Sequence, residues 1–203
     1  MSRAPARTRA RVSREEARQQ IHEAVLEALR TERFRDLSLD KLMTRTHLSR
    51  TAFYRFYDDL PTLVLHVLGD VGTDLYRIVE QWVVDGETDF AAAADRGLSD
   101  IVDFFQLNGP LVRAVIDAAA ADEIVEQAYE EFLLTYERLI AKGFDLLVER
   151  GDLPECDTMA LATALNRMGE RYMLSNFGQE PYGDPETVKA TMRLVWERTL
   201  LPR

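Results

Sequence analysis

The stretch from Ser38 to Tyr57, SLDKLMTRTHLSRTAFYRFY, constrains the fold more than any other part of the chain. Ser38 and Ser49 each stand where a serine hydroxyl can accept a hydrogen bond from an unpaired N–H group in the first turn of a helix. Two short apolar stripes follow these caps, one at Leu39, Leu42 and Met43 and the other at Leu48, Ala52, Phe53 and Phe56. Stripes this short must close on a third helix, so the stretch predicts a helix-turn-helix packed against another helix.

The outer face of the second predicted helix is basic and aromatic. A seven-residue helix that buries its apolar stripe leaves Arg50, Thr51, Tyr54 and Arg55 exposed. Guanidinium, hydroxyl and phenol groups suit contacts with phosphates and base edges in a major groove. We therefore expect DNA contacts from the following residues: Ser38, Ser49, Arg50, Thr51, Ala52, Tyr54 and Arg55.

The segment LSRTAFYRFYDDLPTLV resembles the recognition-helix signature of the TetR family of bacterial transcription regulators. The matching positions are Ser49, Arg50, Ala52, Phe53, Tyr54, Phe56, Tyr57 and Asp59. The resemblance implies a DNA-binding regulator that pairs through its final two helices into a homodimer. Such pairing sets two recognition helices about 34–36 Å apart, one turn of DNA, and predicts a palindromic operator.

The segment also departs from the family pattern. His47 replaces the usual turn glycine, which predicts modest backbone strain. Leu60 replaces a lysine, which removes one expected phosphate contact, and Asp58 and Asp59 add negative charge nearby. We expect modest affinity for DNA.

Charge is divided unevenly along the chain. The net charge is −10, but residues 1–57 carry 13 Lys and Arg against 7 Asp and Glu, whereas residues 58–203 carry 12 against 28. A basic head on an acidic body favours contact with a polyanion through one end only.

The sequence contains no apolar run long enough for a membrane span and no apolar region typical of a signal peptide. The single cysteine, Cys156, cannot form an intramolecular disulfide, which is consistent with a reducing compartment. We expect a cytoplasmic protein.

The remaining pattern is all-helical, with about nine helices and three segments. Residues 1–12 are predicted to be a disordered basic arm, which either lies along DNA or is an inert tail. Residues 13–59 are expected to form the DNA-binding domain, in which Ser13 and Glu16 begin the first helix with a capping box. Residues 60–203 are expected to form a ligand-binding and dimerisation domain.

Periodicity predicts the helices of the second domain. A long helix from Asp59 to about Val84 would join the two domains as a lever. Further helices are expected at 89–107, 110–120, 122–150, 157–177 and 185–200, with Asn108, Gly109 and Pro110 acting as a stop signal.

The C-terminal half, LATALNRMGERYMLSNFG followed by LVWERTLL, is similar to the TetR subgroup of the mycobacterial ethionamide-resistance regulator. In that subgroup the second domain holds a long apolar channel. The resemblance implies that this chain binds a small hydrophobic ligand with Phe104, Phe105, Tyr129, Leu133, Tyr136, Ile140, Asn166 and Trp196. On pattern alone, aromatic residues at helical spacing are more often core than pocket.

Asn166 is set among apolar residues, where an unpaired carboxamide is costly. It would bond either a backbone carbonyl or a ligand, and the pattern does not decide between them. A second anchoring amide expected one turn later in the subgroup is Gly169 here.

No spacing typical of a metal site, a phosphate loop or a catalytic nucleophile is present, so we expect no cofactor and no enzyme activity. Arg113 with Asp117 and Glu170 with Arg171 are interpreted as solvated pairs. We expect a repressor that a hydrophobic ligand releases from its operator. The alternatives are a helical binding or transport protein for an apolar metabolite and, third, a helical enzyme.

Overall fold

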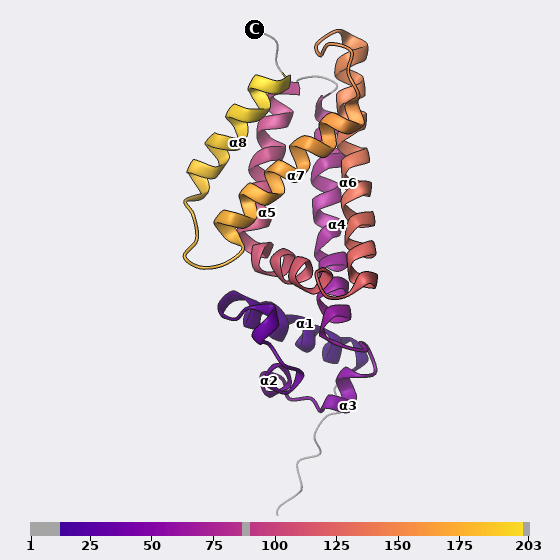
Figure 1. Cartoon of the computed structure of the whole chain (residues 1–203), viewed down its shortest axis with the longest axis vertical. Coiled ribbons are helices and arrows are strands. Elements are labelled where there is room, and N and C mark those ends of the chain that lie inside the picture. The colour runs from indigo at the N-terminus through magenta and orange to yellow at the C-terminus, as the bar shows by residue number, and fades with distance from the viewer. Residues whose placement is uncertain (1–12, 87–89, 201–203) are drawn as a thin grey trace, which may run out of the picture.

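The computed structural model describes residues 13–86 and 90–200, and the regular structure within these ranges is entirely helical (Figure 1). Eight α-helices and one short 3₁₀ helix occur there, with the first three α-helices at one end and a bundle of the other five above them. The predicted all-α class is confirmed. The predicted basic arm, residues 1–12, lies outside the described residues.

Helix α1 (Arg14–Thr31) is the wall that the two short helices require. Its capping box is present, because Ser13 Oγ accepts from Glu16 N at 3.1 Å and Ser13 N donates to Glu16 Oε2 at 2.7 Å. The predicted stripe is its buried face: Ala17, Ile21, Ala24, Val25, Ala28 and Leu29. The 3₁₀ helix η1 (Phe34–Asp36) follows, and Leu37 closes the small core with 8% exposure.

Helices α2 (Leu39–Thr44) and α3 (Arg50–Phe53) form the predicted helix-turn-helix, but α3 is shorter than the seven residues expected. Turns continue it, with Phe56 N and Tyr57 N both donating to the carbonyl of Phe53. No non-glycine residue among those described has a positive φ. The strain expected at His47 is therefore absent, because this turn does not need a glycine.

Helix α4 (Leu60–Gly86) runs from the first three helices into the bundle (Figure 1). Asp59 caps it as predicted, with Thr62 N donating to Asp59 Oδ1 at 2.8 Å. The helix packs against α5 and α6, and also contacts α1. Its predicted position between the two ends of the molecule is confirmed.

Helix α5 (Phe90–Ala119) replaces the two helices predicted at 89–107 and 110–120. Asn108, Gly109 and Pro110 do not stop it. The Asn108 side chain donates to the Phe104 carbonyl at 3.1 Å. A Cβ at Gly109 would clash with the Phe177 carbonyl oxygen, so the glycine permits close approach of another helix. Figure 1 shows the helix changing direction in its second half, as expected for an internal proline.

The last three helices match their predicted bounds within about one residue: α6 (Glu123–Arg150), α7 (Thr158–Phe177) and α8 (Pro185–Leu200). Asp122 and Asp157 cap the first two, and Gly151 ends α6 with a φ of 77°, a conformation that favours glycine. α7 packs against α6 and α5, and α8 packs mainly against α5. The second half of α5 also contacts the head, since α5 packs against α1 and η1.

Candidate DNA-binding surface and ligand pocket

The exposed face of α3 and of the turn that follows it carries the residues that the sequence singled out. Arg50, Thr51, Tyr54 and Arg55 are exposed, and Ala52 is half-buried. Ser49 Oγ accepts from Ala52 N at 3.3 Å, and Ser38 Oγ accepts from Lys41 N at 3.3 Å. The two serines therefore fix the starts of α3 and α2.

Arg50 is oriented by two neighbours. Its guanidinium contacts Asp40 Oδ1 at 3.1 Å and donates to the Tyr54 hydroxyl at 3.5 Å. The bond to Tyr54 and the Asp40 carboxylate both raise the pKa of Arg50. Because these groups are exposed, a phosphate can compete with Asp40 for the guanidinium.

The residues beneath this face tie it to two other helices. Phe53 is fully buried and Tyr57 is 4% exposed. His22 of α1 contacts the Tyr57 hydroxyl through Nε2 at 2.5 Å and Asp70 of α4 through Nδ1 at 3.4 Å. Burial lowers the pKa of His22, which favours the neutral ring. Tyr57, part of the family signature, therefore supports the surface from inside.

Three small cavities lie in a row inside the bundle. The inner cavity, of about 30 Å³, and the middle cavity, of about 10 Å³, share Ile101 and Tyr136 in their walls. The outer cavity, of about 30 Å³, shares Ala94, Leu98 and Trp196 with the middle one.

All eight residues predicted for the ligand site line these cavities. Six of them line the inner one: Phe104, Phe105, Tyr129, Leu133, Tyr136 and Asn166. Ile140 lines the middle cavity, and Trp196 lines both the middle and outer cavities. Helices α5, α6, α7 and α8 supply these side chains, so residues far apart in sequence meet along one route through the bundle.

Asn166 has a partner that the sequence did not reveal. Its Nδ2 donates to Oε1 of Glu137 at 3.1 Å, so the amide nitrogen is bonded to a side-chain carboxylate rather than to a backbone carbonyl. Glu137 is 2% exposed and also accepts from Thr163 Oγ1 at 3.1 Å and Arg167 Nε at 2.7 Å. Its position four residues after buried Leu133 was the available signal, because the same helix face continues inward there.

Glu170 is not the solvated partner of Arg171 that was expected. It is half-buried, lines the inner cavity and accepts a hydrogen bond from the Tyr129 hydroxyl. Burial raises the pKa of Glu170, and burial together with the Glu170 charge raises the pKa of Tyr129. Arg113 and Asp117 do form the expected pair, with Nε and Oδ1 at 3.3 Å.

Gly169 is buried for a packing reason. A Cβ there would meet Met192 Cε at 2.8 Å, so the glycine lets α8 approach α7. A side chain at this position would meet α8 rather than the inner cavity. The polar groups of that cavity are instead Asn166, Glu170 and the tyrosine hydroxyls.

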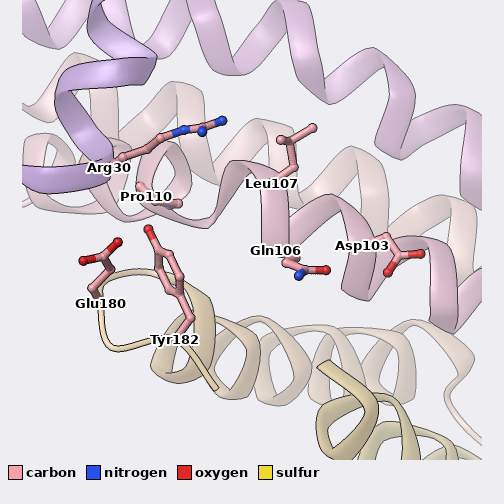
Figure 2. Close-up of a pocket in the computed structure, with 7 residues that line it drawn as sticks. All are labelled: Arg30, Asp103, Gln106, Leu107, Pro110, Glu180 and Tyr182. Atoms are coloured by element: carbon pink, nitrogen blue, oxygen red, sulfur yellow. The ribbon is translucent and has the colours of Figure 1, made fainter. Parts of the chain in front are cut away.

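A surface groove of about 380 Å³ lies elsewhere (Figure 2). Figure 2 shows Glu180 and Tyr182 on one side and Arg30 and Pro110 on the other. Its lining is partly charged and it contains none of the predicted site residues. An open groove of this kind does not suit an apolar ligand.

In the part of the chain that the structure describes, no cluster of three or more His, Cys, Asp or Glu residues could hold a metal ion. None of the helices described is long and apolar enough to cross a membrane.

The sequence profile described as "Transcriptional regulator EthR, C-terminal domain" matches residues 94–201, more than half of the chain. The chain belongs to the EthR family of TetR-type transcriptional regulators. This is a family of DNA-binding proteins and not of enzymes, so the regulator is favoured over the alternatives of a carrier or a helical enzyme.

Sequence matches to curated relatives extend over most of this regulator. The "HTH-type transcriptional regulator EthR" of Mycolicibacterium smegmatis is 26% identical over 176 residues, covering 83% of this chain and 78% of the relative. The protein of the same name from Mycobacterium tuberculosis is 27% identical over 167 residues, covering 79% and 76%.

Solved structures share the fold. A putative TetR-family regulator from Mesorhizobium loti superposes with a TM-score of 0.72 at 16% identity, covering 94% of this chain and 98% of that one. The regulatory protein TetR from Rhodobacter sphaeroides gives a TM-score of 0.69 at 19% identity, covering 91% and 96%.

Proposed function

We propose that this regulator is a homodimeric repressor that leaves a palindromic operator when a small apolar ligand enters its helical bundle. The observation that carries the DNA-binding part is the exposed Arg50, Thr51, Tyr54 and Arg55 face on a helix held from below by Phe53 and Tyr57. Fixed side chains of these types can hold the geometry that base and phosphate contacts need.

Exposed apolar side chains on the last two helices support the dimer. Met168 of α7 is 41% exposed and Leu194 of α8 is 53% exposed. Leu161, Tyr172 and Val195 on the same two helices are only partly buried. Pairing of these faces between two copies would remove this apolar surface from water.

The ligand part of the proposal rests on the row of cavities. Sites for small molecules typically need about 300–1,000 Å³, far more than the 10–30 Å³ of each cavity. A ligand must therefore select a bundle with its helices farther apart. Such a change reaches the head directly, because α4 and α5 both contact α1. The ligand shifts the equilibrium by its difference in affinity for the two bundle conformations.

The DNA contacts are tested by fluorescence anisotropy with a duplex from upstream of the regulator's own gene and a scrambled duplex. Arg50→Ala and Tyr54→Ala should each lower specific affinity roughly 5- to 150-fold, since a good base contact contributes about 1–3 kcal/mol. Arg77→Ala is the matched control, because Arg77 is an exposed arginine on α4 in the bundle. Specific binding retained by both α3 variants would refute the proposed surface.

The same anisotropy measurement can also detect a variant that binds DNA more tightly. Asp40→Asn removes the carboxylate that holds Arg50 and should strengthen DNA binding several-fold at low salt. Asp36→Asn removes the same charge from the head at a residue that contacts Arg35 rather than Arg50. Equal gains in the two variants would indicate general charge repulsion and argue against a specific role for the Asp40 contact.

A further inference from the structure

The groove drawn in Figure 2 lies where the head meets the bundle. Arg30, in the last turn of α1, belongs to one wall, and side chains of α5 and of the connection between α7 and α8 belong to the others. A pocket of about 20 Å³ shares Arg30 and Pro110 with the groove and extends to Arg33 and Phe34 at η1. We call the two together the head–bundle cleft. It shares no lining residue with the three cavities inside the bundle.

The carboxylates of the head–bundle cleft are mostly paired. Three of the four have a basic partner: Glu32 with Arg45 at 2.7 Å, Asp103 with Lys189 at 2.8 Å, and Asp117 with Arg113 at 3.3 Å. The fourth is Glu180, which forms no ion pair within residues 13–86 and 90–200. One carboxylate of the cleft is therefore left without a cation.

Two arginines of the cleft are also unpaired. Arg30 is exposed and Arg33 is half-buried, and neither forms a hydrogen bond or an ion pair with any residue that the structure describes. Two unpaired guanidinium groups stand against the single unpaired carboxylate of Glu180. The cleft therefore carries an excess of positive charge that favours an anion.

DNA does not account for this excess. Figure 1 shows α2 and α3 on the side of α1 that faces away from the bundle, whereas Arg30 and Arg33 line a pocket with Pro110 of α5. A duplex at the exposed face of α3 would lie on the opposite side of the head. The two guanidinium groups are therefore available to a different anion.

The rest of the wall suits an organic molecule. Leu107 is 64% exposed and Tyr182 is 42% exposed, and the Gln106 side chain also lines the groove. Figure 2 shows the Arg30 side chain extending along the groove in the direction of Leu107. The volume of about 380 Å³ lies within the range of about 300–1,000 Å³ that is typical of small-molecule sites.

We propose that the head–bundle cleft is a second effector site, which binds a small organic anion: a carboxylate or phosphate group on an apolar body. The guanidinium of Arg30 holds the anion, because its parallel N–H donors match either group, and Arg33 adds to the attraction. Leu107 and the ring of Tyr182 cover the apolar body. The site is separate from the proposed site for an apolar ligand.

The position of the site predicts its effect on DNA binding. A molecule that touches both α1 and α5 favours the spacing of head and bundle in which its contacts fit. Under the proposed function that spacing belongs to the DNA-binding form, because the cavities of the bundle are closed in it. The anion should therefore strengthen operator binding. This effect rests on the proposed function, whereas binding of the anion does not.

Three probes with the same ring test the chemistry: phenylacetate, phenyl phosphate and the neutral 2-phenylacetamide. Each is titrated into the ¹⁵N-labelled full chain at fixed ionic strength, and nuclear magnetic resonance gives the affinity. Phenylacetate should bind roughly three- to thirty-fold more tightly than phenylacetamide, as expected for a charge-assisted contact at a partly exposed site. The ratio of phenyl phosphate to phenylacetate affinity identifies which anion the site prefers.

Two variants test the guanidinium groups. Arg30→Gln and Arg33→Gln should each weaken binding of the anions at least three-fold and leave phenylacetamide unchanged. Arg35→Gln is the matched control, because Arg35 is an exposed arginine of the head that contacts Asp36 and does not line the cleft. It should keep the wild-type affinity, since charges at a distance are screened. Arg33 lies after the end of α1, so its variant also excludes an effect on the helix end.

A second pair of variants blocks the site at exposed positions where folding is not at risk. Leu107→Glu places a carboxylate in the groove and should abolish measurable binding of the anions. Ile124→Glu is its control, because Ile124 is 78% exposed on α6 and does not line the cleft. The side-chain N–H signals that disappear in Arg30→Gln and Arg33→Gln assign these groups, and both should shift when the wild type binds phenylacetate.

The binding site would be overturned by equal affinity for phenylacetate and phenylacetamide. Anion affinity that is unchanged in Arg30→Gln and Arg33→Gln, or lowered equally in Arg35→Gln, would also overturn it. The effect on DNA is measured by fluorescence anisotropy at constant ionic strength, where phenylacetate should raise operator affinity at least two-fold in the wild type but not in Arg30→Gln. A bound anion that leaves operator affinity unchanged would overturn the effector role. Because the titrations contain no DNA, failure to find an operator would refute the proposed function and not the anion site.

Discussion

At the scale of single residues, the inner cavity combines apolar walls with a half-buried carboxyl group. Glu170 accepts from Tyr129, and burial raises the pKa of this carboxyl group. The folded protein therefore favours the protonated form more than the unfolded chain does. The consequence is a loss of stability as pH rises from the ordinary value near 4.5 through the raised pKa.

Glu170→Gln should remove this loss, because glutamine keeps an oxygen for Tyr129 and carries no charge. We expect the variant to match the wild type near the ordinary pKa of the carboxyl group and to exceed it in stability at pH 8. Urea unfolding at pH 5 and pH 8 measures the difference. Glu131→Gln on the exposed face of α6 is the control and should show no such widening. A Glu170→Gln protein that is less stable than the wild type at pH 8 would mean that the carboxylate itself stabilises the fold.

Glu137 shows what sequence patterns miss at this scale. The carboxylate is fully buried but accepts hydrogen bonds from Thr163, Asn166 and Arg167. Arg167 also donates through Nη2 to Glu130 Oε2 at 2.8 Å. Glu137 was not singled out from the sequence, because only the fold brings α7 close enough to supply three donors to this carboxylate. The role of Asn166 depended on that neighbour, and so it stayed open from the sequence.

At the scale of helices, local chemistry explains what the sequence predicted well. The starts at Ser13, Ser38, Ser49 and Asp59 all have the expected side-chain bonds, because capping involves only residues within one turn. The stop predicted at 108–110 was wrong, because the glycine there serves contact with α7 and the proline sits inside a continuous helix. The length of α3 was also wrong, since tertiary contacts of Phe53 and Tyr57 hold the segment after its single helical turn.

Two glycines in helices should respond oppositely to substitution by alanine. Gly109→Ala places a Cβ against the Phe177 carbonyl and should destabilise the protein by about 1–3 kcal/mol, as overpacking does. Gly69→Ala in α4 meets no atom within 4 Å and should stabilise it by about 0.5–1 kcal/mol, since alanine loses less backbone entropy. Urea unfolding at one fixed protein concentration measures both changes. A Gly109→Ala protein as stable as the wild type would contradict the close approach of α5 and α7.

At the scale of the whole molecule, the two ends differ in charge, and side-chain contacts connect them. The basic residues gather in the first 57 positions and the acidic excess lies in the remainder, so the bundle repels DNA while the head attracts it. His22 contacts both Tyr57 beneath α3 and Asp70 on α4. This contact joins the recognition surface to the helix that also lines the cavities through Leu68 and Leu75.

The size of the cavities could not be predicted from the sequence. Patterns identified which side chains gather in the bundle, because aromatic and aliphatic residues at helical spacing face inward. They do not report how far apart the facing helices stand, and a difference of a few ångströms separates a packed core from a channel. The binding roles of these residues are therefore proposals, which ligand-binding measurements test.

The most direct test of a dimeric repressor with its recognition surface on α3 is selection of bound duplexes from a random pool by the full-length protein. We predict enrichment of an inverted repeat whose half-sites lie about 10 base pairs apart, one turn of DNA. Arg50→Ala should lose the enriched sequence. Failure to enrich any sequence, or enrichment of a single asymmetric site that Arg50→Ala binds equally well, would contradict this account.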